Sequence, residues 1–134
     1  MGSNDEAKAI TEQVNTVPAK KTGVARLHAA TIYSMRGLKS AYISEEAFRL
    51  EVLFCVFLAP LAFYFGETPI ERLLLILPLF LVLVVELLNS AVEAIVDRIG
   101  PEYHELSAQA KDIGSAAVFL SLALFAFVWL TILI

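Results

Sequence analysis

The chain has 134 residues, 58% of them apolar, with one cysteine and a formal net charge of −4. A mean hydropathy of +0.72 lies above that of a typical soluble domain, and one cysteine excludes a disulfide framework. The composition is therefore unlike that of a typical soluble domain, and no nucleic acid is expected as a partner. Together with the apolar runs described below, it favours an all-α integral membrane protein.

Residues 1–21 are polar and predict a flexible tail. They lack the apolar central region of a cleavable signal peptide. The rest of the chain, 22–134, is expected to form one membrane domain. Within it we expect a surface helix and three spans, at about 22–42, 46–66, 70–98 and 107–134.

The segment at 22–42 carries apolar or small side chains at three- and four-residue steps, as on one face of a helix. These are Val24, Leu27, Thr31, Met35, Leu38 and Tyr42. Basic residues lie elsewhere around the same helix. An amphipathic basic helix beside a membrane is expected to lie in the interface. Whether it only anchors the chain or also contributes to a site stays open.

Three long apolar runs follow, at Ala47–Phe65, Leu73–Val96 and Ala116–Ile134. A spanning helix needs about 20 apolar residues, so each run predicts one transmembrane helix. The third run is apolar on all sides and has no face for solvent. Soluble alternatives are therefore disfavoured.

The lysines and arginines predict the orientation of these spans. Seven of the ten lie at or before Arg49. The positive-inside rule then places the N-terminus and the Asp97–Asp112 loop in the cytoplasm. The GETPIER loop and the C-terminus are expected on the periplasmic side of a bacterial inner membrane.

The second span contains an unusual polar stretch, VELLNSAVEAIVDR (Val85–Arg98). At about 100° per residue, its polar side chains share one stripe of the helix. They are Glu86, Asn89, Ser90, Glu93 and Asp97. An ionised side chain in the hydrocarbon centre costs on the order of 3 kcal/mol. Arg49 is a candidate ion-pair partner, and Mg²⁺ would relieve both the burial cost and the repulsion between carboxylates.

The following segment, IGPEYHELSAQAKDIGSAAV, gathers charged residues at the mouth of the same helix. Among them, the ammonium group of Lys111 suits phosphate oxygens. The small residues from Gly114 to Ala117 allow close helix approach or close backbone approach to a ligand, and both interpretations stay open.

The stretch ELLNSAVEAIVDRIGPEYHELSAQAKDIGSAAV resembles the signature of the bacterial integral-membrane diacylglycerol kinases. Its E-x-x-N-S-A-x-E-A-x-x-D and A-K-D-x-G-S-A-A motifs carry the likeness. The resemblance continues upstream through ARLHAATIYSMRGLKSAYISEEAFRLE and covers roughly 23–134. The residues of these motifs are most similar to those of the Gram-negative diacylglycerol kinases.

The resemblance implies an ATP-dependent kinase of phospholipid metabolism. Such enzymes transfer the γ-phosphoryl group of MgATP to 1,2-diacylglycerol and give phosphatidic acid and ADP. It also implies a homotrimer of three-span protomers, with active sites shared between neighbours near the cytoplasmic face of the inner membrane.

By motif position, the resemblance assigns roles to individual residues. Glu86 corresponds to the general base, Asn89 to its catalytic neighbour, and Glu45 and Glu93 to the metal ligands. The positions around ATP are Arg26, Tyr33, Glu45, Glu93, Glu102, Tyr103, His104, Lys111 and Asp112. The positions near the lipid are Arg26, Phe48, Arg49, Glu86 and Ser115. Because Glu46 adjoins Glu45, the choice between these two metal ligands stays open.

Two other functions remain possible at this stage. A kinase acting on undecaprenol would share the same catalytic residues. An ion or proton pathway would also explain buried carboxylates, although the third span offers no polar line toward the outside.

Overall fold

The computed structural model describes residues 22–134, which form four α-helices. They are α2 (Gly23–Ser44), α3 (Glu46–Phe65), α4 (Pro69–Ile99) and α5 (Glu105–Leu133). No strand occurs in this part of the chain, so the prediction of an all-α fold is confirmed. The tail expected at 1–21 lies outside the described residues. The boundary between two compact units follows Arg36.

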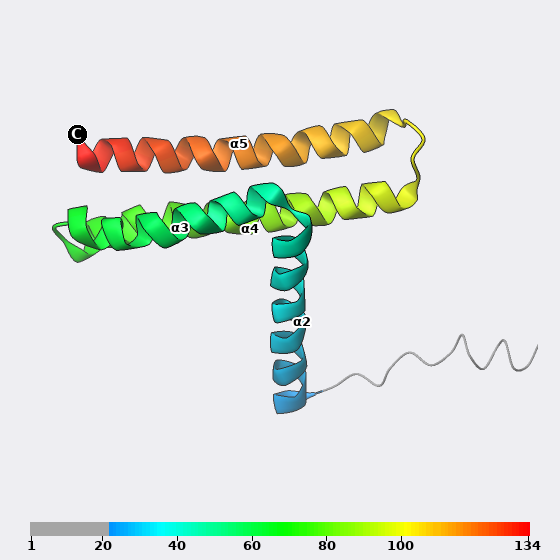
Figure 1. Cartoon of the computed structure of the whole chain (residues 1–134), viewed down its shortest axis with the longest axis horizontal. Helices are drawn as coiled ribbons and strands as arrows, with labels where there is room; N and C mark the ends of the chain where they lie inside the picture. Colours follow the sequence, from blue (N-terminus) through cyan, green and yellow to red (C-terminus); the bar gives the residue numbers. More distant parts are fainter. Residues whose placement is uncertain (1–21) are drawn as a thin grey trace, which may run out of the picture. The chain divides into compact units, whose positions relative to one another are not determined.

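In residues 37–134, α4 packs against both α3 and α5 (Figure 1). Each of these three helices is long and apolar enough to cross a membrane, which confirms the prediction of three candidate spans. The turn between α3 and α4 lies at the same end of this unit as the C-terminus, and the turn between α4 and α5 lies at the other (Figure 1). We call these the Gly66 end and the Gly100 end.

At the Gly66 end, the turn into α4 is closed by a complete capping box. The Thr68 hydroxyl accepts a hydrogen bond from the Glu71 backbone N–H (3.2 Å), and Glu71 Oε2 accepts from the Thr68 N–H (3.3 Å). Arg72 Nε also donates to the Gly66 carbonyl (2.9 Å). Side chains therefore satisfy the backbone groups that a helix start and a short turn would leave unpaired.

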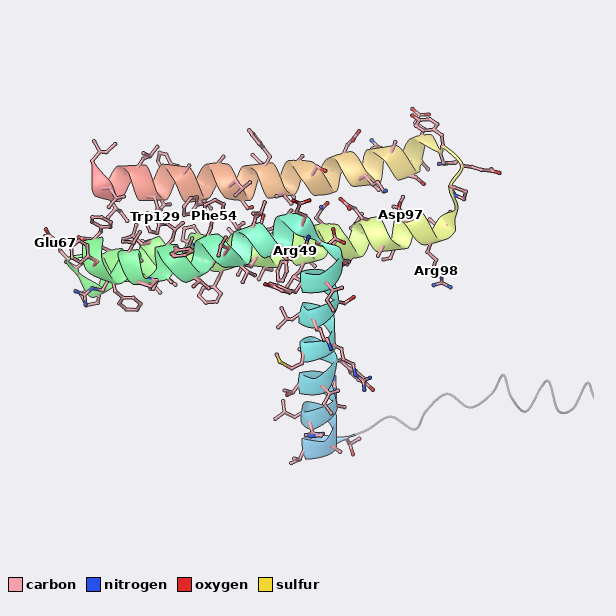
Figure 2. All side chains as sticks on the ribbon, viewed as in Figure 1. Arg49, Phe54, Glu67, Asp97, Arg98 and Trp129 are labelled. Atoms are coloured by element: carbon pink, nitrogen blue, oxygen red, sulfur yellow. The ribbon has the colours of Figure 1, made fainter. Side chains whose placement is uncertain are left out.

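The hydrophobic core lies toward the same end and joins all three long helices. Its buried members are Ala62, Leu75, Leu79 and Trp129. The indole Nε1 of Trp129 donates to the Leu75 carbonyl (3.0 Å), and Figure 2 shows this side chain on the side of α5 that faces α3 and α4. Cys55, half-buried, packs against the cluster, as expected for a packing residue.

The junction between α2 and α3 is a break at Glu45, whose backbone is extended. Arg49 Nη1 donates to the carbonyls of Tyr42 (3.2 Å) and Ile43 (3.1 Å) at the end of α2. The candidate ion pair of Arg49 with a carboxylate is not formed within residues 22–134, where its guanidinium instead binds these two carbonyls. The break leaves carbonyls of α2 without helical partners, and the nearby arginine satisfies two of them.

Candidate active site

The site begins with the sharp turn at the Gly100 end. Helix α4 stops at Gly100, whose φ of 153° is one that residues with a Cβ rarely adopt. Helix α5 then starts after His104, whose Nδ1 accepts a hydrogen bond from the Leu106 N–H (3.2 Å). This short connection makes α4 and α5 an antiparallel hairpin, so polar residues late in α4 face polar residues early in α5.

Asn89 and Glu93 are joined on α4. Asn89 Nδ2 donates to Glu93 Oε1 (3.0 Å). Glu86, one turn earlier, is only 4% exposed and Asn89 only 9%, whereas Glu93 is half-buried. The stripe expected from the sequence therefore runs from a buried carboxylate to a partly accessible one.

Further carboxylates approach Glu86 from other parts of the chain. Glu86 interacts electrostatically with Glu93 on its own helix and with Glu45 at the α2–α3 break. Glu51, on α3, also repels Glu86. Glu46 is exposed on the first turn of α3 and is not among these neighbours. The structure thus gathers three of the expected residues, Glu45, Glu86 and Glu93, and adds Glu51.

At the mouth of the hairpin, Lys111 of α5 forms an ion pair with Asp97 of α4. Figure 2 shows Asp97 on the side of α4 that faces α5, whereas Arg98 points to the opposite side. The ammonium group of Lys111 also lies within electrostatic reach of Glu93. The Lys111 side chain is 39% exposed and that of Asp97 64%. An exposed pair of this kind is weak, so an anionic ligand can compete for Lys111.

The other expected site residues are placed as follows. Glu102, Tyr103 and His104 are exposed in the turn between α4 and α5, and Asp112 and Ser115 are exposed on α5. Phe48 is buried at the start of α3, and Arg49 holds the end of α2. Arg26 and Tyr33 are exposed on the first part of α2, in the compact unit that ends at Arg36.

Two polar atoms at this site are buried without a hydrogen-bond partner among the described residues. They are Oδ1 of Asn89 and Oε2 of Glu51. Glu51 is also the charged residue lining a groove of about 390 Å³ between the three long helices. The rest of that lining is almost entirely apolar, with Phe54 and Leu58 from α3 and Phe125 from α5. A buried unpaired oxygen beside an apolar groove indicates a place for an amphipathic ligand.

The carboxylates also suit a magnesium ion. Mg²⁺ in kinase sites is usually held by one or two protein carboxylates, with the remaining positions taken by phosphate oxygens and water. Glu45 and Glu93, the two expected metal ligands, both interact electrostatically with Glu86. Within residues 22–134, no group of three His, Cys, Asp or Glu residues is arranged to hold a metal by itself.

Sequence reasoning did not select Glu51 or Asp97 for the site. Asp97 lies on the polar stripe of the second span, so helical periodicity could have identified it as a site residue. Glu51 carried no such signal, because its approach to Glu86 depends on how α3 is rotated against α4. Periodicity within one helix does not determine that rotation.

Comparison with known proteins gives a consistent result. A family model described as prokaryotic diacylglycerol kinase matches residues 32–133. The diacylglycerol kinase of Haemophilus influenzae is 54% identical over 110 residues, covering 82% of this chain and 93% of the relative. That of Pseudomonas aeruginosa is 48% identical over 114 residues (85% and 93%). That of Escherichia coli K12 is 46% identical over 112 residues (84% and 92%).

Proposed function

Because the chain belongs to the prokaryotic diacylglycerol kinase family, we propose that it transfers the γ-phosphoryl group of MgATP to the hydroxyl of 1,2-diacylglycerol. The products are phosphatidic acid and ADP. The observation that carries this proposal is the buried Glu86, which interacts electrostatically with Glu45 and Glu93 and with Glu51, the charged residue that lines the apolar groove. This arrangement supports a base that acts between a water-soluble donor and a lipid acceptor.

Glu86 is the proposed general base. It accepts the proton of the lipid hydroxyl as that oxygen bonds to the γ-phosphorus and the bond to ADP breaks. A carboxylate sheltered from water is a stronger base than an exposed one, and Glu86 is 4% exposed. Asn89 holds the neighbouring Glu93 through its amide. Phosphoryl transfer depends mainly on positioning and charge stabilisation, so a carboxylate base together with a metal held by carboxylates suits this chemistry.

The nucleotide is proposed to bind at the Gly100 end. Glu45 and Glu93 would hold Mg²⁺, which neutralises charge on the transferring phosphates. Lys111 would exchange Asp97 for a phosphate oxygen, since its present ion pair is exposed. The exposed residues of the turn from Glu102 to His104, and Asp112, would contact the rest of the nucleotide. Arg26 and Tyr33 are proposed as further nucleotide contacts, on the resemblance of their motif.

The lipid is proposed to enter from the groove between the long helices. An acyl chain matches its apolar lining, and the buried oxygen of Glu51 lies where a polar glycerol group would provide a partner. Phe48, Arg49 and Ser115 are proposed as contacts of the lipid near the interface, and Arg26 as a contact shared with the nucleotide. These assignments rest on the family motif.

The length of α4 supports a site at the cytoplasmic boundary. Its 31 residues span roughly 46 Å, whereas the hydrocarbon core is about 30 Å thick. If Pro69 lies at the periplasmic boundary, Glu86 lies roughly 26 Å deeper, close to the opposite boundary. We therefore propose an inner-membrane protein with a cytoplasmic N-terminus and a periplasmic C-terminus, as the lysines and arginines predict.

A homotrimer with shared active sites is also proposed. One face of α4 carries apolar residues at alternating three- and four-residue steps, the spacing of a helix–helix seam. They are Leu74, Leu77, Leu81, Val84 and Leu88, each at least 40% exposed in the protomer. Association of three copies along this seam would cover these side chains. It would also allow one protomer to complete the site of its neighbour.

The test is transfer of labelled phosphate from ATP to lipid in mixed micelles. Diacylglycerol and undecaprenol are offered separately, with and without Mg²⁺, to the wild type and to Glu86→Gln. We expect labelled phosphatidic acid that requires Mg²⁺. Loss of a general base should lower the rate by about 10²- to 10⁴-fold in the variant.

The outcomes separate the rival functions. Preference for undecaprenol would keep the chemistry and change the acceptor. Absence of transfer to either lipid would refute the kinase proposal and favour an ion pathway. A fully active Glu86→Gln variant would show that another group takes the proton, for which Glu51, which also lines the groove, is a candidate.

A further inference from the structure

The side chain of Asn89 contacts Gly114 of α5, and this contact has no part in the mechanism proposed above. It is 91% buried (9% exposed), and its amide nitrogen donates to Glu93 Oε1. Its Oδ1 has no hydrogen-bond partner among the described residues. If the nitrogen and oxygen of the Asn89 amide were exchanged, the amide oxygen would face an oxygen of the Glu93 carboxylate and repel it. The hydrogen bond to Glu93 therefore determines which way the amide is turned. The oxygen consequently points away from Glu93.

Gly114 of α5 lies where that oxygen points. A Cβ placed on Gly114 would collide with Asn89 Oδ1 and would lie 3.4 Å from Asn89 Cγ. The hydrogen that replaces this Cβ therefore faces the oxygen, as in the Cα–H···O contacts found between packed helices. The contact gives the buried oxygen a weak donor. It also explains a glycine inside a helix, where alanine is the better helix former.

We propose that Gly114 is a positioning residue that seats the Asn89 side chain and, through its amide, aims the Glu93 carboxylate at the metal. The inference rests on the proposed function, in which Glu93 is a metal ligand. A methyl group at position 114 would turn the Asn89 amide away or push α5 from α4. Either change weakens the Asn89–Glu93 hydrogen bond and leaves the carboxylate free to rotate.

The first measurement is metal affinity, which does not depend on turnover. Mn²⁺ replaces Mg²⁺ and is titrated by electron paramagnetic resonance into the micellar protein with a non-hydrolysable ATP analogue. Partners that orient a metal ligand are typically worth about 10- to 100-fold in affinity. We expect Gly114→Ala to weaken Mn²⁺ binding by at least about tenfold. Gly37→Ala is the matched control, because a Cβ there meets nothing within 4 Å.

The second measurement is a double-mutant cycle on the apparent unfolding temperature in detergent, without metal or nucleotide. Gly114→Ala should lower this temperature in the wild-type background. It should not lower it in the Asn89→Ala background, because the colliding atoms are gone. Gly37→Ala should leave the temperature unchanged or raise it, since alanine favours the helix.

These results distinguish the inference from the proposed function. Equal destabilisation by Gly114→Ala in both backgrounds, or unchanged Mn²⁺ affinity, overturns the positioning role even if the wild type phosphorylates diacylglycerol. A wild type that transfers no phosphate refutes the kinase. In that case the Mn²⁺ titration and the unfolding cycle still decide whether Gly114 orients Glu93.

Discussion

The two ends of the α3–α4–α5 unit differ in whether their polar groups have hydrogen-bond partners. At the Gly66 end, the capping box of Thr68, the Arg72 side chain and the Trp129 indole satisfy the groups they meet. In the half of the unit nearer the Gly100 end, carboxylates crowd around Glu86, and the buried Oε2 of Glu51 lacks a hydrogen-bond partner among residues 22–134. The first end is typical of a structure optimised for stability, and the second of a site that needs a ligand.

This contrast locates function without reference to any relative. Unpaired buried oxygens and clustered like charges both disfavour the folded state. They persist where a bound cation or substrate compensates for them. Substitutions at the two ends should therefore have opposite effects on activity and on stability.

The largest effect is expected for Glu93→Gln at the Gly100 end. Loss of a charged metal ligand should lower phosphate transfer by roughly a hundredfold or more, and added Mg²⁺ should restore part of it. The unfolding temperature should stay the same or rise, because one of the crowded charges is removed. Glu105→Gln, on the first turn of α5, is the matched control and should keep its activity. Full activity of Glu93→Gln would refute the metal assignment.

The next effect is expected for Trp129→Ala at the Gly66 end. Trp→Ala changes in cores cost about 3–5 kcal/mol, and we expect about 3 kcal/mol here, because lipid rather than water surrounds the unfolded helices. The free energy of unfolding in detergent measures the loss. The rate per folded molecule should be unchanged. Trp129→Phe keeps a six-membered aromatic ring but loses the pyrrole part of the indole together with the hydrogen bond to Leu75, and should cost less than Trp129→Ala. A loss of activity without a loss of stability would contradict the contrast between the ends.

The smallest effect is expected for Thr68→Ala. Removal of this cap should cost about 1 kcal/mol in the free energy of unfolding, with no change in phosphate transfer. Thr68→Ser retains the hydroxyl and should restore most of the loss. Equal destabilisation by both substitutions would show that the methyl group, and not the capping hydrogen bond, matters at this position.

Much of the fold could be predicted from the sequence. The three spans follow from the length and apolar character of their runs, because a membrane requires such runs whatever the packing. The shared stripe of Glu86, Asn89 and Glu93 follows from helical periodicity alone. The structure adds the hydrogen bond between Asn89 and Glu93 to that stripe.

The remaining features depend on how the helices pack against one another. The approach of Glu51 to Glu86 requires the rotation of α3, and the Asp97–Lys111 pair requires the tight turn at Gly100. The candidate ion pair of Arg49 did not form because its partners are carbonyls exposed by a helix break, which residue types do not indicate. The sequence left two interpretations open for Gly114, and the structure favours contact with a side chain of the neighbouring helix.

The unequal lengths of the spans have a consequence for how this protein responds to lipids. Helix α3 has 20 residues, close to the thickness of an ordinary bilayer, whereas α4 has 31 and projects beyond it. A difference between the length of α4 and the thickness of the bilayer would then change the depth of Glu86 in the membrane, while the fold stays the same. A bilayer thicker by about 3 Å would draw roughly two more residues of α4 into hydrocarbon and move the base away from aqueous nucleotide. The acyl composition of the membrane would thus set the depth at which its own lipids are phosphorylated.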